Sequence, residues 1–301
     1  MKLKYHEGEI TVQKRAGVHE EAKRVSKVIR SQIPPIAQLF LHDQQMVIVS
    51  TIDKDNNVWA SVLTGNPGFI KAIDEKTVEI DCSHDLSDPL IENLRQNNEI
   101  GILAIELSTR RRMKLKGKAN LLPENKICVH TERVYSLCPK YIQAREIVDN
   151  TNKQKQEQCF RLYENLNEKQ IDWIKMADTF FIASYHPETG ADVSHRGGNP
   201  GFIKVLNKNK ILFPDYSGNK MFNTLGNITA NPNAGIIFID FEGGGTLQIT
   251  GRGKVIWEED KVREFTGAER LVEFEIEHIL ETQKAIQFRH RFLEYSPFNP
   301  K

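Results

Sequence analysis

The sequence predicts a mainly β protein with flanking helices, built from two tandem antiparallel barrels that are closed or nearly closed. The heptapeptide Gly-Asn-Pro-Gly-Phe-Ile-Lys occurs at 65–71 and again, 133 residues later, at 198–204. Around each copy the same order of alternating β-rich runs returns with one helix between them, which indicates a duplication. No Gly-x-Gly-x-x-Gly follows a strand and no Gly-x-x-x-x-Gly-Lys-Ser/Thr is present, so glycine-rich nucleotide binding is excluded.

The duplication also predicts how the 301 residues are divided, because this length suffices for two domains with separate cores. We expect an N-terminal extension at 1–34, a first barrel at 35–149, a polar linker at 150–166 and a second barrel at 167–301. Apolar spacing within the extension predicts a helix at 18–29.

The two halves are expected to contain the same elements in the same order, since strand and turn signals alternate alike in both. In the first half these are a helix at 36–42, strands at 46–50, 58–64 and 77–82, a helix at 87–98, and strands at 100–107, 113–122 and 127–131. In the second half they are a helix at 171–177, strands at 180–185, 191–197 and 210–213, a helix at 219–230, and strands at 235–241, 246–257 and 272–277.

Composition excludes several classes of partner. The net charge is +1, from 41 Lys and Arg against 40 Asp and Glu, so no overall field attracts nucleic acid or an anionic membrane. No apolar run approaches the roughly 20 residues of a membrane helix, and we expect a cytoplasmic protein. The four cysteines lack Cys-x-x-Cys or zinc-finger spacing, which favours reduced thiols and no metal site. Cys138 has no assigned purpose.

A site for an anion is predicted in the second half, where a strand turns into a helix whose free N–H groups carry partial positive charge. Lys220 adds a full charge, and Arg196 at the end of the neighbouring strand can reach the same place. The alternative is that these cations are solvated and that Ser217 caps the helix. The candidate binding residues are Arg196, Phe213, Pro214, Ser217, Asn219 and Lys220.

The first half differs at the equivalent corner. Leu63 stands opposite Arg196 and Ser87 opposite Lys220, while Leu86 stands opposite Asn219. The acidic residues Asp85 and Asp88 flank that helix start; they would cap the helix but repel a phosphate. The sequence therefore predicts one anion site instead of two.

Four segments, 138–143, 191–202, 213–227 and 294–300, together resemble the pyridoxamine 5'-phosphate oxidase-like family of FMN-binding split barrels, and its tandem subgroup in particular. The resemblance implies two split barrels that form an internal pseudo-dimer with FMN in the cleft between them. A homodimer of such chains stays open as a further assembly.

In that family a strand Arg and a Ser-Arg-Lys turn bind the FMN phosphate, and Arg196 and Lys220 match two of these positions. Gly218 and Asn219 replace the Ser and Arg of the turn, and Ser217 is expected to compensate in part. The resemblance further implies ring-side contacts from the first half, for which Trp59, Ser61 and Thr64 are the candidates. Trp59 could equally be a core residue, since an aromatic side chain fits an alternating strand.

The arginine run and the orientation of one strand each allow two interpretations. The three arginines at 110–112 are either part of a solvated turn or a second anion contact, for which the substrate is a candidate. His195 and Arg196 point to opposite faces of their strand, and we expect Arg196 to face the cleft.

The function expected from this resemblance is that of an FMN-binding oxidoreductase acting on an unassigned small molecule. Residues 287–292 lack the substrate motif of true pyridoxamine phosphate oxidases, so vitamin B6 synthesis is not expected, and no general acid or base stands out. The alternative is a flavin or haem binder or sensor without turnover, with His186, His195 and His290 as haem-ligand candidates. A third option is a corner that holds only free anions.

Overall fold

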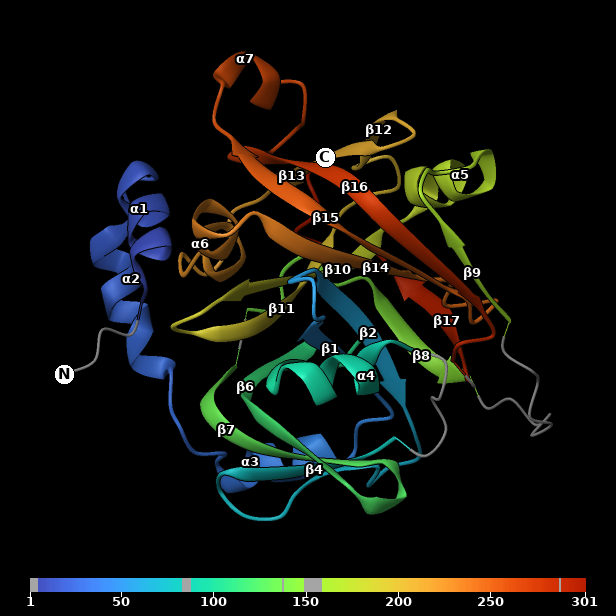
Figure 1. The fold of residues 1–301 in the computed structure, drawn as a ribbon. Helices are drawn as coiled ribbons and strands as arrows, with labels where there is room; N and C mark the ends of the chain where they lie inside the picture. The colour runs from blue at the N-terminus through green and yellow to red at the C-terminus, as the bar shows by residue number, and fades with distance from the viewer. Residues whose placement is uncertain (1–4, 83–87, 137, 149–158, 287) are drawn as a thin grey trace.

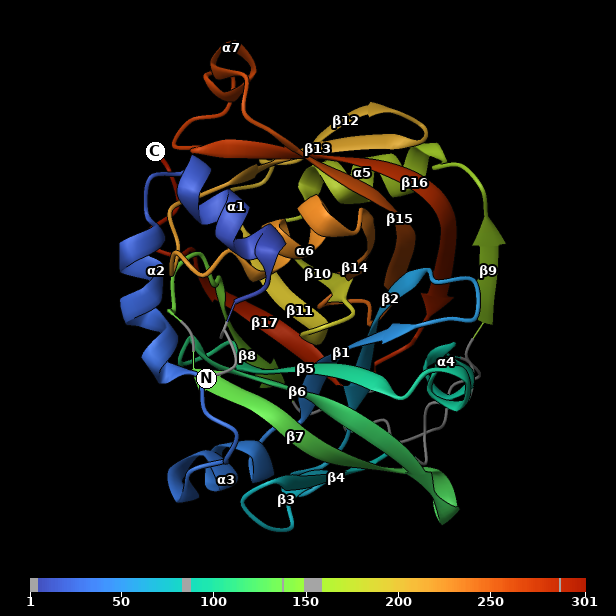
Figure 2. The same cartoon turned by 60° about the vertical axis from the view of Figure 1, so that its left-hand side comes forward.

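The computed structural model describes residues 5–82, 88–136, 138–148, 159–286 and 288–301. Its core consists of two antiparallel sheets, one for each half of the chain (Figure 1). The first half lies below and the second half above in both Figure 1 and Figure 2. We call residues 35–148 the first half and residues 159–301 the second half.

The first sheet has seven strands in the order β2-β1-β5-β6-β7-β4-β3. In chain order they are β1 (Met46–Ile52), β2 (Val58–Thr64), β3 (Ile70–Ala72), β4 (Thr77–Asp81), β5 (Glu99–Glu106), β6 (Arg111–Leu122) and β7 (Lys126–Ser136).

The second sheet repeats this order as β11-β10-β14-β15-β16-β13-β12. Its strands are β10 (Thr179–His186), β11 (Gly190–Gly197), β12 (Lys204–Asn207), β13 (Lys210–Asp215), β14 (Asn233–Ile239), β15 (Thr246–Ile256) and β16 (Arg270–Gln283). An eighth strand, β9 (Cys159–Tyr163), pairs with β16. The fold class predicted from the sequence is therefore confirmed, and the repeated strand order is consistent with a tandem duplication.

The helices also occur in equivalent pairs. Each half begins with a helix, α3 (Pro35–His42) or α5 (Glu168–Met176), and places another between its fourth and fifth main strands, α4 (Leu90–Gln96) or α6 (Asn223–Ala230). Asn167 caps α5 in a capping box with Gln170. Short helical turns complete the two halves: η2 (Pro123–Asn125) and α7 (Glu259–Val262).

The N-terminal extension forms α1 (Glu7–Arg15), α2 (His19–Val25) and the turn η1 (Ser26–Val28). The helix predicted at 18–29 corresponds to α2 and η1 together, whereas α1 was not predicted. The chain breaks at Gly17, whose φ of 71° ends α1. Helix α1 packs against α6 of the second half, as the two views show (Figure 2).

An apolar interface, which we call the seam, joins the two halves. On the first half it includes Ile48, Val62 and Leu103, and on the second Phe181 and Val193. These side chains are buried because they lie on the strand faces that meet at the seam, while the opposite faces of β1, β2 and β10 contribute to a barrel core. The separate cores lie inside each barrel.

Contacts across the seam are reciprocal. A Cβ added at Gly101 would lie 2.8 Å from the Ala191 carbonyl oxygen, and one at Gly235 would lie 2.4 Å from the Val58 carbonyl oxygen. Gly101 and Gly235 occupy equivalent places in the two halves, and so do Val58 and Ala191. This exchange of equivalent partners is the geometry of an isologous dimer, here within one chain.

A third, two-stranded sheet ties the end of the first half to the end of the chain. It pairs β8 (Ala144–Val148) with β17 (Arg289–Glu294). Arg145 in β8 also forms an ion pair with Asp178, with its Nη2 at 2.7 and 2.6 Å from the two carboxylate oxygens. The halves are thus linked by polar contacts as well as by the seam.

Other predicted boundaries also differ from the structure, as three examples show. The helix predicted at 219–230 begins only at Asn223, because Lys220 and Phe222 have left-handed φ values of 65° and 59°. Part of the predicted linker, Cys159–Tyr163, is the strand β9. The closing strand predicted at 127–131 extends to Ser136.

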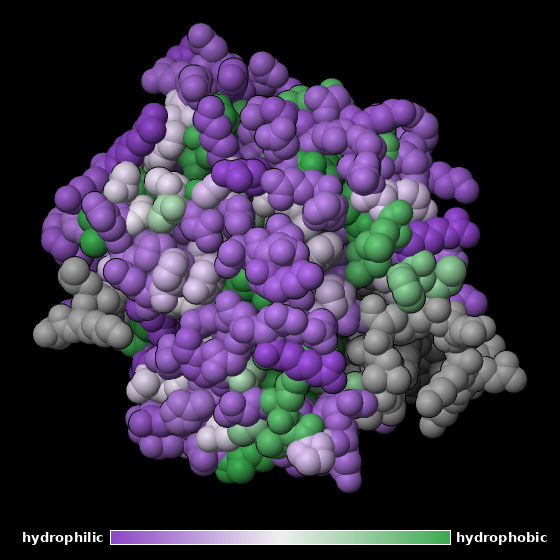
Figure 3. Space-filling view, viewed as in Figure 1, coloured by the Kyte–Doolittle hydropathy of each residue, from purple (hydrophilic) through white to green (hydrophobic). Residues whose placement is uncertain are grey.

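The molecular face shown in Figure 3 is mainly hydrophilic, with small hydrophobic areas. None of the helices within the described residues is long and apolar enough to cross a membrane.

Candidate functional site

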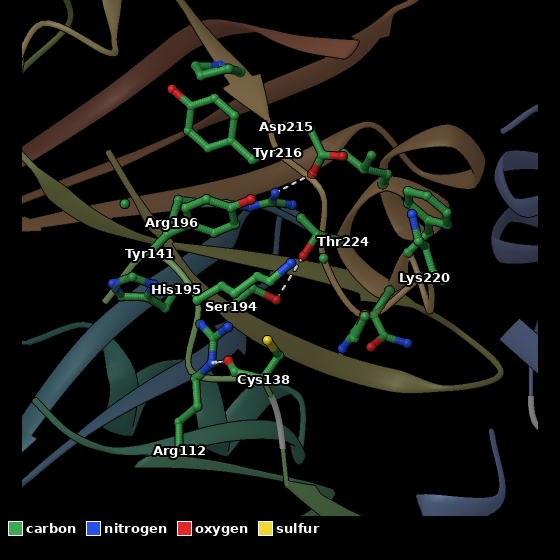
Figure 4. A pocket seen from close by; sticks show the side chains of 18 of the residues that line it. Arg112, Cys138, Tyr141, Ser194, His195, Arg196, Asp215, Tyr216, Lys220 and Thr224 are labelled. Carbon is green, nitrogen blue, oxygen red and sulfur yellow. Dashed lines mark hydrogen bonds and ion pairs between the residues drawn. The ribbon is translucent and has the colours of Figure 1, made fainter. Parts of the chain in front are cut away.

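A pocket opens beside the seam at the end of β11, and both halves line it (Figure 4). We call it the seam pocket. The second half contributes the end of β11, the loop after β13 and the start of α6, and the first half contributes β6 and the segment 138–141. Its charged lining residues are Arg112, Lys114, Lys140, Arg196, Asp215 and Lys220. Five cations against one carboxylate favour an anionic ligand.

The wall from the second half carries two of the predicted phosphate ligands. Arg196 forms an ion pair with Asp215, which lies 3.6 Å from Arg270 as well. The Nε of Arg196 is buried and has no hydrogen-bond partner among the described residues. Lys220 Nζ lies 3.9 Å from a Glu269 carboxylate oxygen. Arg196 is therefore held in place with a donor still to spare.

The wall from the first half consists of β6 and the segment that follows β7. Arg112 Nε donates a hydrogen bond to the Cys138 carbonyl oxygen at 2.9 Å. Burial lowers the pKa of Arg112 to about 10, with Cys138 opposing and Arg196 adding to the shift. Figure 4 shows Arg112 and Cys138 below Arg196 and Asp215. The two arginines, one from each half, thus lie within electrostatic reach of one another.

Tyr141 connects these two walls. Its hydroxyl donates to the Ser217 carbonyl oxygen at 3.0 Å, and its ring centroid lies 5.1 Å from that of Tyr216. The first half is thereby fastened to the loop that carries Lys220.

The floor beneath the pocket is a buried network of Lys114, Lys116 and Asp192, of which only Lys114 belongs to the pocket lining. The Nζ of Lys114 lies 2.8 Å from Asp192 and 2.6 Å from Ser194 Oγ, and that of Lys116 lies 3.0 Å from Asp192. Burial opposes both charged forms: it lowers the pKa of Lys114 to about 8, whereas for Asp192 the two ammonium groups outweigh it and lower the pKa to about 2. Thr224 donates to Ser194 Oγ at 2.9 Å.

His195 is only 7% exposed and lines the pocket beside Arg196. Its Nε2 has no hydrogen-bond partner in the part of the chain that the structure describes. Burial, and then the charges of Arg112, Arg145 and Arg196, lower its pKa well below the usual value, so the ring is neutral. We expected only one of the two neighbours to face the cleft; both border it because the pocket extends around the end of β11.

The equivalent corner of the first half has a different chemistry. Asn93 donates to Thr51 Oγ1 as Asn227 donates to Ser184 Oγ, so the scaffolds agree. In place of Lys114, however, the corner receives Gln248, which donates to Asp88 Oδ2 at 3.0 Å.

Asp88 is the acidic group of that corner. Its other carboxylate oxygen accepts from Ser61 Oγ at 2.6 Å, and burial raises its pKa. Leu63 is buried where Arg196 stands in the second half. The other residues named for this corner, Asp85, Leu86 and Ser87, lie outside the described residues. The described part of this corner thus carries a carboxylate where the seam pocket carries cations.

The structure brings four of the predicted binding residues together in the seam pocket: Arg196, Pro214, Asn219 and Lys220. Phe213 is fully buried in the core of the second half, and Ser217 is outside the pocket lining, with its carbonyl oxygen accepting from Tyr141.

The ring-side candidates lie elsewhere. Trp59 donates through Nε1 to Asp53 at 3.0 Å, Ser61 bonds to Asp88, and Thr64 is buried outside the pocket lining. Their contact with a flavin stays a prediction.

Sequence reasoning gave no role to Lys114, Lys140 or Tyr141, and offered Arg112 only as an alternative. For Arg112 and Lys114, however, the sequence did contain a signal. Cations at 112, 114 and 116 alternate with the apolar Met113 and Leu115, so they share one strand face. Met113 and Leu115 belong to the core of the first half, and the cations therefore face the second half. Among the described residues, no group of three or more His, Cys, Asp or Glu could hold a metal ion.

The two barrels, with a cationic pocket at their seam, define a split-barrel protein of the pyridoxamine 5'-phosphate oxidase-like fold. Residues 166–296 match the family described as Pyridoxamine 5'-phosphate oxidase. The match confirms the resemblance for the second half of the chain. No curated protein matches the chain.

Solved structures with a similar fold each correspond to about two fifths of the chain. HupZ of Group A Streptococcus is 9% identical over 44% of this chain and 98% of its own, with a TM-score of 0.32. An FMN-binding protein from Syntrophomonas wolfei is 10% identical over 43% and 97%, with a TM-score of 0.28. HutZ, the heme storage protein from Vibrio cholerae, is 11% identical over 35% and 95%, with a TM-score of 0.27.

Proposed function

We propose that the protein is an FMN-binding flavoprotein with oxidoreductase chemistry, and that the seam pocket holds the FMN phosphate. The observation that carries this proposal is the convergence of five cations on a pocket lined by Arg196, whose buried Nε lacks a partner among the described residues. A phosphate dianion supplies both the countercharge and the acceptor oxygens that these groups need. The family match of the second half supports the choice of FMN.

The residues that would hold the phosphate are Arg196, Lys220 and Asn219. When bound, FMN supplies the electron transfer, and the protein binds and orients it. Neutral His195 can donate or accept a hydrogen bond without changing the charge of the pocket. The substrate is proposed to be a small molecule that reaches the same pocket.

Titration with FMN and with riboflavin, followed by flavin fluorescence, tests this assignment. Riboflavin lacks the phosphate, so FMN should bind more tightly. Arg196→Gln should weaken FMN binding about 10- to 100-fold, the value of about 1.5–3 kcal/mol for hydrogen bonds to a charged group, and should leave riboflavin binding unchanged. Lys71→Gln, in the other copy of the heptapeptide, is the control, since Lys71 is half-exposed and pairs with Glu79. Undiminished FMN binding by the Arg196 variant would refute the phosphate site.

Haem binding is the second candidate; the observation that favours it is that His195 is a lining residue whose buried Nε2 has no partner among the described residues. A neutral imidazole is a metal ligand. Of the other two candidates, His186 stacks on His6 with ring centroids 3.7 Å apart, and His290 lies between Phe241 and Phe288. Neither lines the pocket.

The visible spectrum of the purified protein distinguishes the candidates. Oxidised-flavin bands favour FMN, whereas a Soret band that disappears in His195→Ala favours haem. A colourless protein that ignores both cofactors would leave the corner as a site for free anions.

A further inference from the structure

We infer that the seam pocket contains a second oxyanion subsite, formed by Arg112 and Lys140 of the first half, and that the substrate is a small molecule carrying its own carboxylate or phosphate. The inference rests on the proposed function, because it assigns the Arg196 wall to the FMN phosphate. It adds two binding residues, Arg112 and Lys140, and a charged group on the substrate, neither of which the FMN phosphate site requires.

The distribution of countercharges separates the two subsites. Three of the five pocket cations already have carboxylates: Arg196 has Asp215, Lys220 has Glu269, and Lys114 has Asp192. In the described part of the chain, Arg112 and Lys140 form no ion pair with a carboxylate. The uncompensated charge of the pocket is therefore on the first-half wall.

Of the two residues, Arg112 gives the stronger evidence for an oxyanion subsite. Its guanidinium is desolvated enough for burial to lower its pKa, and Arg196 adds like charge. Arg112 is half-buried, and a partly desolvated cation without a counterion is unfavourable unless a ligand supplies the missing charge. Nε is fixed on the Cys138 carbonyl oxygen, and neither terminal nitrogen donates a hydrogen bond to a described residue. Two parallel N–H groups thus stay available for an oxyanion.

Lys140 is held on the same wall by a preorganised segment. Its Nζ lies 5.4 Å from the centroid of the Phe298 ring, near the C-terminus. Three residues further on, the side chain of Gln143 donates to the Gly198 carbonyl oxygen at 3.1 Å and accepts from the Ser296 amide at 2.7 Å. Together with the Tyr141 bond to Ser217, these contacts fix the segment before any ligand arrives.

Carboxylate and phosphate share the geometry that a guanidinium recognises, and the experiment separates them. Protein saturated with FMN is titrated with benzoate, with phenyl phosphate and with uncharged benzamide, and binding is followed by the change in flavin absorbance and by calorimetry. We expect at least one oxyanion to bind and benzamide not to bind. Whichever of benzoate and phenyl phosphate binds more tightly shows whether the substrate carries a carboxylate or a phosphate.

Two neighbouring arginines provide a matched pair of variants. Arg112→Gln should weaken oxyanion binding about 10- to 100-fold and leave FMN affinity within a few-fold. Arg111→Gln removes the same charge from a side chain that is 64% exposed and paired with Glu106, and should change neither. Lys140→Gln should weaken oxyanion binding and leave FMN affinity unchanged. This variant tests the subsite if the Arg112 variant does not fold.

Failure of the two proposals can be told apart. If FMN binds but no oxyanion does, or if Arg112→Gln and Lys140→Gln bind oxyanions as well as the wild type, the subsite is wrong and the cofactor site stands. If FMN does not bind, the proposed function fails. The same titrations in FMN-free protein, followed by melting temperature, then show whether Arg112 alone recognises an oxyanion.

Discussion

At the scale of residues, Asp192 holds together the floor of the seam pocket. It is fully buried and forms ion pairs with Lys114 and Lys116, both of which reach it from the other half of the molecule. An ion cluster of this kind adds little net stability, but removal of one member leaves the others without compensation. The polar floor therefore ties the chemistry of the pocket to the folding of both halves.

Asp192→Asn should lower the free energy of unfolding by about 3–5 kcal/mol, because two buried ammonium groups lose their counterion. As a control, Asp260→Asn on exposed α7 should change the free energy of unfolding little. Unfolding in denaturant measures this free energy for both variants.

The difference in the free energy of unfolding between the wild type and Asp192→Asn should depend on pH with a definite sign. Against the effect of burial, the two ammonium groups lower the pKa of folded Asp192 to about 2, below its usual value of 3.8. Its contribution is therefore fully present above pH 3.8 and is lost as the pH falls towards 2. The gap between wild type and Asp192→Asn should narrow over this range. A gap that widens in acid would contradict the role of Asp192 as a counterion.

At the scale of elements, helix α1 supports the loop that carries Lys220. The side chain of Gln13 donates to the Met221 carbonyl oxygen at 3.1 Å, and Glu9 accepts from the Asn223 side chain. The two helices approach closely because Gly8 and Gly226 face each other: a Cβ at Gly226 would lie 2.5 Å from Glu9 Cα. The N-terminal extension is thus part of the binding site's framework.

Gly226→Ala should displace α1 and cost about 1–3 kcal/mol of stability, the usual penalty for overpacking. FMN should also bind more weakly, since the loop loses its support. Gly245→Ala is the control, because a Cβ there would meet only ordinary contacts at 3.4 Å or more. Melting temperature and FMN titration test the pair. Normal FMN affinity in a destabilised Gly226 variant would show that α1 does not position the loop.

The start of α6 shows why part of this site escaped sequence reasoning. The repeat predicted a strand, a turn and a helix in the correct order, and thereby brought Arg196 and Lys220 together. It could not give the helix start, because left-handed φ values at Lys220 and Phe222 are rare for residues other than glycine. Arg112 and Lys140 were missed for another reason: they serve the other half of the molecule, and a motif within one half does not report a contact across the seam.

At the scale of the whole molecule, the seam makes the two halves one cooperative unit. Large apolar side chains such as Phe181 and Ile48 are buried there, and each lies in a strand that also faces a barrel core. Exposure of this surface on separation would be unfavourable. We therefore expect the halves to unfold together.

Tryptophan fluorescence tests this expectation, because Trp59 is in the first half while Trp173 and Trp257 are in the second. Trp59→Phe leaves the second-half reporters, and the double variant Trp173→Phe, Trp257→Phe leaves the first-half reporter. Within each variant, this fluorescence and the far-ultraviolet circular dichroism of the whole chain should give the same midpoint in denaturant. A fluorescence transition clearly displaced from the dichroism would show that one half unfolds separately.

The reciprocal contacts at Gly101 and Gly235 have a consequence for how such a protein can change over generations. In an assembly of two identical chains, every mutation is imposed on both corners at once. Once the two copies are fused, Leu63 and Gln248 can be altered without touching Arg196 and Lys114. A single chain with two similar halves can therefore carry charge at one corner and not at the other.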